Sequence, residues 1–302
     1  FQISKKGPFY FLLAGVAIIS FIVHLSYINN GITWFSHRDI EDKRAVLPLG
    51  KLHNAFASRY GDTGYYRPVA TIANSIDYAV YGIWGPGFHL TNLILHLIAA
   101  AIAPFFLLPF FDFRKSEMLL AALIFGIHPV SSLIVGAISY RDDELAAIFT
   151  MLALIFHVKA RIGNKKSYFI LACLSFILGF SSKETAVLWI PSFIVLWELL
   201  NFKKLPKSSL SKALLITEFL LIILYIGIRT LVVPELWRTR GVELTISQAA
   251  GTRLTAIVHQ ISILISPFKP PYSDATAITH IFSPQAMLIL ILMLILLSAI
   301  VM

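Results

Sequence analysis

The sequence predicts an all-α polytopic membrane protein, and three observations support this prediction. Hydrophobic residues make up 57% of the 302 residues, and the mean hydropathy is +0.78. Apolar runs close to the roughly 20 residues that cross a bilayer as a helix recur along the chain. Basic residues gather in short loops that alternate along the chain, as in multi-pass proteins. The net charge of +9 therefore reflects membrane topology, and we expect no nucleic-acid partner.

The basic loops also orient the predicted helices in the membrane. Lys and Arg gather at residues 5–6, 114–115, 159–166 and 203–212, while the segments between them are close to charge-balanced. Since cytoplasmic loops carry the excess of Lys and Arg, we expect these segments and the N-terminus to lie in the cytoplasm. The membrane is expected to be a bacterial or archaeal plasma membrane or the endoplasmic reticulum.

The first predicted span covers residues 8–28 and runs outward, so that residues 29–86 form the first extracytoplasmic loop. This loop has balanced charge and many aromatic side chains, and we expect it to fold on the membrane interface. Within it, apolar residues recur at helical spacing over 69–81, directly after Arg67-Pro68. Since proline is favoured at the first position of a helix, the pattern predicts an interfacial helix that begins there.

Apolar runs predict the spans that follow this loop. The run that starts near Met118 is broken at His128-Pro129, because proline leaves a backbone carbonyl without its helical partner. The segment 130–139 is then expected to be a re-entrant or interfacial piece. The remaining predicted spans are residues 90–111, 145–158, 168–180, 186–200, 213–233 and 286–302, with a short span or surface helix at 254–265.

We expect residues 1–302 to form a single transmembrane domain built as a helix bundle, with residues 29–86 as its first extracytoplasmic loop. The sequence begins with Phe1 rather than Met and ends inside an apolar run. The full-length protein is therefore expected to continue in a C-terminal part beyond residue 302.

Three charged clusters share the predicted outer face, at residues 36–42, 141–144 and 183–184. Charges close to the hydrocarbon are costly and usually belong to a functional site or a partner. Carboxylates can accept a proton from an attacking hydroxyl, whereas Arg and Lys suit a phosphate. With nearby aromatic side chains, which suit a sugar or a lipid tail, the clusters predict a transferase that acts on a lipid-phosphate-linked donor.

Each cluster also has a purely structural interpretation. Residues 39–43 fit a solvated loop, residues 141–143 an ion pair at a helix end, and residues 183–184 an ion pair at a hairpin tip. A second set of polar residues is interpreted as structural, because its members share one helix face or adjoin the proline or the hairpin tip. They are His89, Asn92, His96, His128 and Glu184.

Other polar residues give no clear site. His128 is expected to donate a hydrogen bond at the proline kink, and Glu198 and Glu218 are expected to be isolated. No set of His, Cys, Asp and Glu has the spacing of a metal site, and the sequence leaves open whether a metal is needed.

Several short elements occur in an order that is similar to a known family. They are YYRPV at 65–69, FHLTN with a later His at 88–96, HPV at 128–130, RDD with LAA at 141–147, and SKETAV at 182–187. In this order they resemble the transmembrane and tetratricopeptide-repeat O-mannosyltransferases and their bacterial relatives, which have the GT-C glycosyltransferase fold. The resemblance implies a polyprenyl- or dolichyl-phosphate-linked sugar as donor and a protein Ser/Thr hydroxyl outside the cytoplasm as acceptor.

The resemblance implies roles for individual residues in an inverting transfer. Asp39 is the expected general base, and Asp143 is expected to orient the acceptor or to replace that base. A polyprenyl phosphate leaves as an anion and needs charge stabilisation rather than protonation. The expected donor-phosphate-binding residues are Arg67, Arg141, Lys183, Arg238 and Arg240.

Two departures from the family pattern support an alternative. Arg38 occupies the first of two family aspartate positions, and Leu133 occupies an acidic position after the His-Pro-Val element. The alternative is a catalytically degenerate scaffold subunit that keeps the GT-C fold within a larger membrane complex. Its partners would be other subunits of that complex, in addition to the membrane lipid that either hypothesis requires.

Overall fold

The computed structural model describes residues 6–32, 36–202, 205–206, 208–234, 245–265, 282–283 and 287, and these form helices and loops with no strand. The chain divides into two units, Phe1–Leu236 and Trp237–Met302. Most of the described part of the second unit is one helix, α11 (Ile246–Ile265), which extends the predicted 254–265 segment toward the N-terminus. The single-domain expectation stays a prediction, and the predicted 286–302 span lies outside the described residues, apart from Met287.

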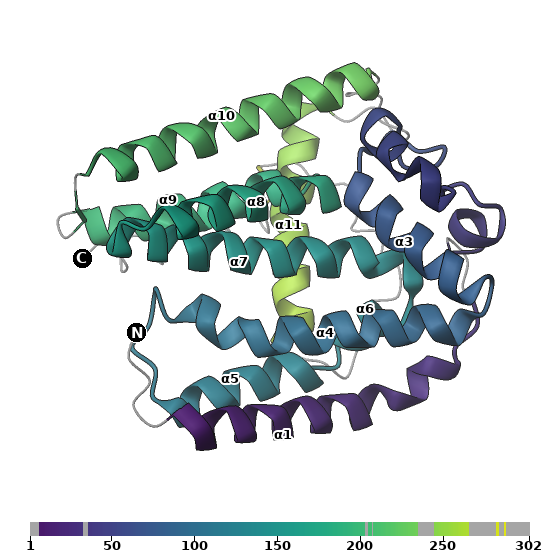
Figure 1. The fold of residues 1–302 in the computed structure, drawn as a ribbon, viewed down its shortest axis with the longest axis horizontal. Coiled ribbons are helices and arrows are strands. Elements are labelled where there is room, and N and C mark those ends of the chain that lie inside the picture. The colour runs from purple at the N-terminus through teal and green to yellow at the C-terminus, as the bar shows by residue number, and fades with distance from the viewer. Residues whose placement is uncertain are drawn as a thin grey trace. The chain divides into compact units, whose positions relative to one another are not determined.

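The long helices of the first unit run along a common direction (Figure 1). They pack in layers, with α1, α4 and α5 in contact on one side, α7, α8 and α9 next to them, and α10 against α8. Their bounds are α1 (Lys6–His24), α4 (Gly85–Leu107), α5 (Lys115–Ile127), α7 (Arg141–Gly163), α8 (Lys166–Ser182), α9 (Ala186–Asn201) and α10 (Ser209–Val232).

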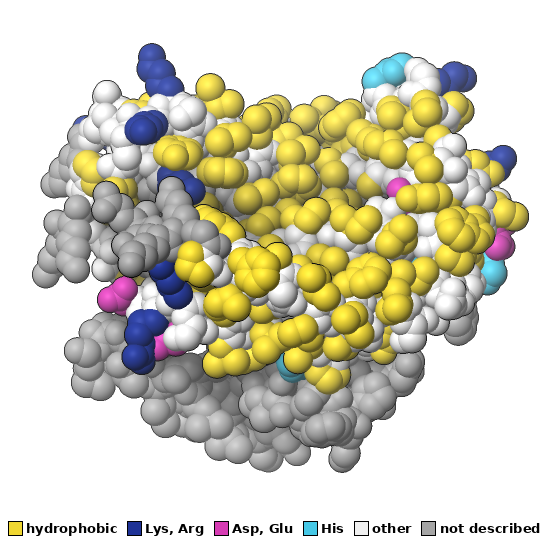
Figure 2. Space-filling view, turned by 60° about the horizontal axis from the view of Figure 1, so that its bottom comes forward, with side chains coloured by type: hydrophobic (Ala, Val, Ile, Leu, Met, Phe, Trp, Pro, Cys, Tyr) yellow, Lys and Arg dark blue, Asp and Glu magenta, His cyan; other side chains and the backbone are white. Residues whose placement is uncertain are grey.

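The predicted all-α polytopic membrane class is confirmed. Four helical segments among the described residues are long and apolar enough to cross a bilayer: Pro8–Asn29, Gly85–Leu107, Ile138–Gly163 and Ser209–Val232. The predicted spans at 168–180 and 186–200 are the shorter apolar helices α8 and α9. Figure 2 shows a broad surface of hydrophobic side chains between charged side chains at the two ends, as expected for a surface that contacts lipid.

Short elements gather at one end of the first unit, where α1 ends and α4 begins (Figure 1, right). This end, called the site end, also holds the start of α7 and the α8–α9 connection. The opposite end, called the basic end, holds the loops that follow α4, α7 and α9. The short elements are η1 (Leu25–Asn29), η2 (His37–Glu41), η3 (Leu49–Ala57), α3 (Pro68–Tyr81), α6 (Ser131–Gly136) and η4 (Ile138–Tyr140).

The first loop is folded, as predicted, and α3 begins at the predicted proline. Pro68 occupies the first turn of α3, where its missing N–H has no helical partner to lose. The helix ends at Gly82, whose φ of +61° is a left-handed conformation that glycine adopts without strain. That turn places α3 beside the start of α4, and the two helices are in contact.

The predicted break at His128-Pro129 separates α5 from α6. The backbone of His128 is extended (φ −60°, ψ 132°), as is usual before proline. The His128 carbonyl accepts hydrogen bonds from the backbone N–H of Ser131 (2.9 Å) and from its hydroxyl (2.5 Å). The turn that follows the proline is therefore closed by hydrogen bonds within the protein.

α7 is longer than the predicted span at 145–158, because its first turn contains the charged residues 141–144. Three acidic side chains occupy that turn, and carboxylates at a helix N-terminus interact favourably with the helix dipole. At its other end, Asn164 adopts a left-handed conformation (φ 49°) that lets the chain turn into α8. α7 and α8 then pack along each other as an antiparallel hairpin.

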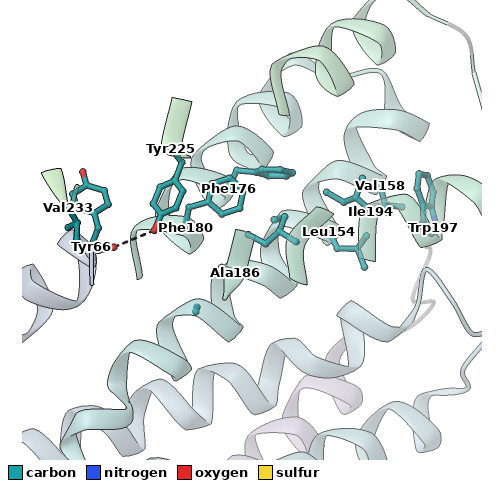
Figure 3. Packing of buried hydrophobic residues seen from close by; sticks show 13 residues of the cluster. Tyr66, Leu154, Val158, Phe176, Phe180, Ala186, Ile194, Trp197, Tyr225 and Val233 are labelled. Carbon is teal, nitrogen blue, oxygen red and sulfur yellow. Dashed lines mark hydrogen bonds between the residues drawn. The ribbon is translucent and has the colours of Figure 1, made fainter. Parts of the chain in front are cut away.

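The main hydrophobic core joins α7, α8, α9 and α10 (Figure 3). Phe176 and Phe180 of α8 pack edge to face, and Phe180 also contacts Tyr225 of α10. The Tyr225 hydroxyl donates to the backbone carbonyl of Tyr66, which comes from the first loop (3.4 Å). Because lipid gives helices little hydrophobic reason to associate, this close packing and the polar contact at its edge stabilise the bundle.

Glu198 and Glu218 are not isolated, which corrects the expectation. His157 of α7 lies between them, with Nδ1 2.8 Å from a Glu218 carboxylate oxygen and Nε2 3.0 Å from one of Glu198. Arg161, one turn further along α7, donates to both oxygens of Glu198 at 2.5 and 2.7 Å. This cluster could not be predicted from the sequence, because its members lie on three helices, α7, α9 and α10.

We expect Gly126→Leu to destabilise the packing of α5. A Cβ at Gly126 would overlap Ser20 Oγ of α1 and lie 3.4 Å from the Ala100 Cβ of α4. Overpacking of this kind costs about 1–3 kcal/mol, so thermal unfolding in detergent should occur at a lower temperature. Gly15→Leu is the control, because nothing lies within 4 Å of a Cβ there. Equal unfolding temperatures for the two variants would contradict the close approach.

We expect Arg161→Met to lower the free energy of unfolding by about 2–3 kcal/mol, because it leaves Glu198 without its bidentate partner. The loss is smaller than for a fully buried pair because the Glu198 side chain is 16% exposed. Adding Glu198→Met should restore most of the stability. Arg114→Met is the control, since its pair with Glu117 is solvent-exposed. A double variant no more stable than Arg161→Met alone would argue against a paired network.

Candidate functional site

The site end is organised around Arg141, the first residue of α7, which is 1% exposed. Its Nη2 lies 2.7 Å from Asp77 and donates to the Phe88 carbonyl (3.0 Å). Nε donates to Asn92 (2.9 Å) and Nη1 to Asn74 (3.2 Å). Burial raises the pKa of the Asp77 carboxyl, and the charge of Arg141 opposes that shift. The guanidinium therefore joins α7 to α3 and α4.

These contacts use all three nitrogens of the Arg141 guanidinium, so the predicted donor-phosphate role has no geometric support. The structural ion pair that the sequence left open accounts for this residue. The partner is Asp77 of α3, however, and not the neighbouring Asp142 or Asp143.

The polar side chains on one face of α4 are buried and make hydrogen bonds to other groups of the protein. His89, Asn92 and His96 are each at most 1% exposed. The two ring nitrogens of His96 lie 3.2 Å from a Glu144 oxygen and 3.1 Å from the Gly126 carbonyl. His89 and Asn92 contact backbone carbonyls, at Gly31 and Val135 for His89 and at Ile134 and Ala137 for Asn92. These contacts fit the structural interpretation.

His128 acts differently from the expected donor. Its Nδ1 accepts the backbone N–H of Val130 at 3.2 Å. The ring therefore caps the turn after Pro129 as an acceptor, and the donors at the kink come from Ser131.

Five ionised side chains meet where the α8–α9 connection faces the start of α7. We call this group the charged clasp: Arg67, Asp142, Asp143, Lys183 and Glu184. Arg67 pairs with Asp142 through Nη1, and its Nε donates to Glu184 at 2.9 Å. Lys183 Nζ donates to Asp143 at 2.5 Å and lies 3.7 Å from Asp142. Glu184 also accepts the backbone N–H of Tyr66 at 2.7 Å.

The clasp differs in exposure from one side to the other. The Asp142 side chain is 3% exposed and Arg67 12%, whereas Lys183 is 19% and Asp143 35% exposed. Burial lowers the pKa of the Arg67 guanidinium, but Asp142 and Glu184 outweigh burial and raise it. Arg67 is therefore held as a cation inside the clasp, while the Lys183–Asp143 pair forms its accessible edge.

Asp39 lies in a buried position of the first loop, 5% exposed. The Tyr60 hydroxyl donates to one carboxylate oxygen (3.2 Å), and Arg38 Nε donates to the other (3.3 Å). Burial raises the pKa of the Asp39 carboxyl above its usual value, and Arg38 and Tyr60 partly oppose that shift. Burial also raises the pKa of Tyr60, so its hydroxyl stays protonated and can donate.

Tyr60 links Asp39 to the rest of the site end. Its hydroxyl accepts a hydrogen bond from Asn74 Nδ2 (3.2 Å). The other side-chain atom of Asn74, Oδ1, accepts a hydrogen bond from Arg141. The Arg67 guanidinium lies 5.8 Å from the centre of the Tyr60 ring and 4.0 Å from that of Tyr65. The three charged clusters predicted from the sequence are thus joined at one end of the bundle.

Two of the predicted site residues lie outside the described part of the chain, and several residues of the site were not predicted from the sequence. Arg238 and Arg240 lie outside the described residues. Within the described part of the chain, no three His, Cys, Asp or Glu side chains are placed to hold a metal ion. Sequence reasoning missed Tyr60, Asn74 and Asp77 and did not select Asp142. The three-residue spacing of Asn74 and Asp77 on the predicted helix was an available signal.

The arrangement limits what the clasp can bind. Two cations face three carboxylates within it, so the clasp has no excess positive charge to attract an anionic ligand. Lys183 is the most exposed cation, and its main partner Asp143 is the most exposed carboxylate. Exchange of Asp143 for a phosphate oxygen therefore disturbs the fewest buried contacts, and it frees a carboxylate beside the phosphate.

Comparison with known proteins supports the resemblance predicted from the motifs. No family model and no solved structure matches the chain. The chain is 24% identical over 192 residues to protein O-mannosyl-transferase Tmtc1 of Drosophila melanogaster, which covers 58% of this chain and 21% of that protein. It is 32% identical over 145 residues to protein O-mannosyl-transferase TMTC4 of Homo sapiens, which covers 42% and 20%.

A protein O-mannosyl-transferase of Caenorhabditis elegans is 35% identical over 131 residues, covering 42% of this chain and 18% of the relative. The chain thus spans about a fifth of the length of the curated relatives that it matches. Over these residues the predicted resemblance is confirmed: the chain is similar to the transmembrane and tetratricopeptide-repeat protein O-mannosyltransferases.

Proposed function

We propose that this chain is the membrane part of a glycosyltransferase of the GT-C type. It moves a mannose-like sugar from a polyprenyl- or dolichyl-phosphate donor to a Ser or Thr hydroxyl of a protein. The observation that carries the proposal is the buried Asp39 carboxylate at the same end of the bundle as the partly exposed Lys183–Asp143 pair. The names of the similar proteins supply the sugar and the protein acceptor.

The proposed reaction is a single displacement. The acceptor oxygen attacks C1 of the sugar while the bond from C1 to the phosphate oxygen breaks, and Asp39 takes the hydroxyl proton. The polyprenyl phosphate leaves as an anion, and Lys183 stabilises its charge once Asp143 has exchanged for a phosphate oxygen. Asp143 is then free to orient the acceptor. One displacement needs no second nucleophilic carboxylate and inverts the sugar configuration.

The proposed location of the reaction is the extracytoplasmic face. The loops and helix ends at the basic end carry Arg114, Lys115, Lys159, Lys165 and Lys166, and segments rich in Lys and Arg are retained in the cytoplasm. The site end then faces the opposite side, where the acceptor would be a secreted or membrane protein.

We expect Asp39→Asn in the full-length protein to lower kcat by about 10²–10⁴-fold, the usual contribution of a general base. The assay measures transfer of labelled mannose from dolichyl-phosphate mannose to acceptor protein. Asp62→Asn is the control, because Asp62 belongs to the same loop and its side chain is 68% exposed in a pair with Arg44. Unchanged transfer by Asp39→Asn would show that the base is assigned wrongly.

The pH dependence offers a separate test of Asp39. Because burial raises the pKa of this carboxyl, kcat/KM should fall on acidification at a pH above the usual range of an aspartate. Arg38 lowers that pKa, so Arg38→Ala should move the acidic limb to still higher pH. Arg44→Ala, which pairs with Asp42 and Asp62 instead, should leave the limb in place. If Arg38→Ala leaves the acidic limb of kcat/KM at the same pH, the limb does not come from Asp39.

The contact between Arg38 and Asp39 favours a second candidate, a non-catalytic scaffold subunit. The Arg38 Nε lies 3.3 Å from Asp39, so a cation neutralises the carboxylate that the transfer needs. In this candidate Asp39, Tyr60 and Arg38 only order the first loop within a larger complex. A purified native complex that contains the chain and never turns over lipid-linked mannose would favour the scaffold, whereas turnover that Asp39→Asn abolishes would favour the transferase.

A further inference from the structure

The basic end contains a groove that the proposed reaction does not use. It lies between α1 and α4 on one side and α7 and α8 on the other, with a volume of about 650 Å³. We call it the basic-end groove and define it by Tyr10, Phe105, Ile155, Lys159, Lys165 and Tyr168. These residues lie at the start of α1, the end of α4, the last turns of α7, the α7–α8 turn and the start of α8. The charged clasp lies at the other end of α7.

The groove has an apolar part and a polar mouth. Phe105 of α4 and Leu152 and Ile155 of α7 line the apolar part. Leu152 precedes Lys159 by two helical turns, so the apolar part extends about 10 Å from the mouth at 1.5 Å per residue. The polar lining residues are Tyr10, Lys159, Lys165 and Tyr168. All four lie within about one turn of the helix ends at the basic end, and we call the part of the groove that they line its mouth. This distribution matches a molecule with a hydrocarbon chain and a polar head.

The two lysines at the mouth lack carboxylate partners among the described residues. Lys159 Nζ lies 5.6 Å from the centre of the Tyr168 ring and 6.0 Å from that of Phe156, and it forms none of the ion pairs found in the described part of the chain. Lys165 forms none of them either. Lys183 in the charged clasp differs, because carboxylates already neutralise it. The mouth of the groove is therefore a cationic site with its charge uncompensated.

We propose that the basic-end groove binds an anionic glycerophospholipid. An acyl chain lies along Phe105, Leu152 and Ile155, and the phosphate of the headgroup contacts Lys159 and Lys165. The argument is charge complementarity combined with the apolar lining. A lysine near an anionic membrane surface contributes about fivefold to binding, so two lysines favour an anionic headgroup over a zwitterionic one by about 25-fold. The inference is independent of the proposed transfer reaction.

The test is native mass spectrometry of the full-length protein, released from nanodiscs that contain equal amounts of phosphatidylglycerol and phosphatidylcholine. We expect phosphatidylglycerol to be retained in preference. Replacing both lysines, Lys159→Gln with Lys165→Gln, should reduce that preference by about 25-fold. Lys165→Gln alone should reduce it by about fivefold, and Lys166→Gln is the matched control for that single variant, because it removes one charge from the adjacent position, which does not line the groove.

A second variant separates the groove from a simple charged surface. Ile155→Trp fills the apolar part and leaves both lysines in place, so it should reduce retention of both lipids by a similar factor. The proposal is overturned if the double lysine variant keeps the wild-type preference or if Lys166→Gln lowers it as much as Lys165→Gln does. It is also overturned if Ile155→Trp leaves retention unchanged, because the lysines then act only as a surface patch.

Discussion

The burial of Arg141 is the constraint on which the site end depends. A buried guanidinium is costly unless its charge and its donors are matched, and here α3 and α4 supply the matching groups. Asn74 has a double role, because it accepts from Arg141 and donates to Tyr60, which in turn donates to Asp39. The start of α7 and the position of Asp39 are thus set by one connected group of hydrogen bonds.

The charged clasp follows from the same constraint. Since Arg141 fixes the first turn of α7, Asp142 and Asp143 of that turn face the α8–α9 connection, where Lys183 and Glu184 lie. Nearly every charge in the clasp is neutralised by another. Such a site does not attract an anion by excess charge, and binding depends on how readily one carboxylate is exchanged.

Hydropathy predicted the helices, because lipid imposes apolar runs of fixed length. The charge pattern predicted that the charged clusters lie at the same end of the bundle, because the basic loops mark the opposite end. Both patterns failed at α7, where Arg141 and its neighbours resembled a loop although their charges are paired inside the bundle. Partners far apart in the chain could not be predicted. Asn74 and Arg141 are separated by 67 positions, and nothing in either segment indicates the other. The cluster of His157, Glu198 and Glu218 was missed for the same reason.

The two ends of α7 together define a fixed length across the membrane. Arg141 is locked into protein contacts at one end, and Lys159 lies at the mouth of the groove near the other. Eighteen helical residues separate them, or about 27 Å, close to the roughly 30 Å thickness of a hydrocarbon core. The part of α7 between these two residues is therefore about as long as a hydrocarbon core is thick. In a thinner or thicker membrane, the mismatch must be absorbed by tilt of the more loosely enclosed α1 and α10 or by deformation of the lipid.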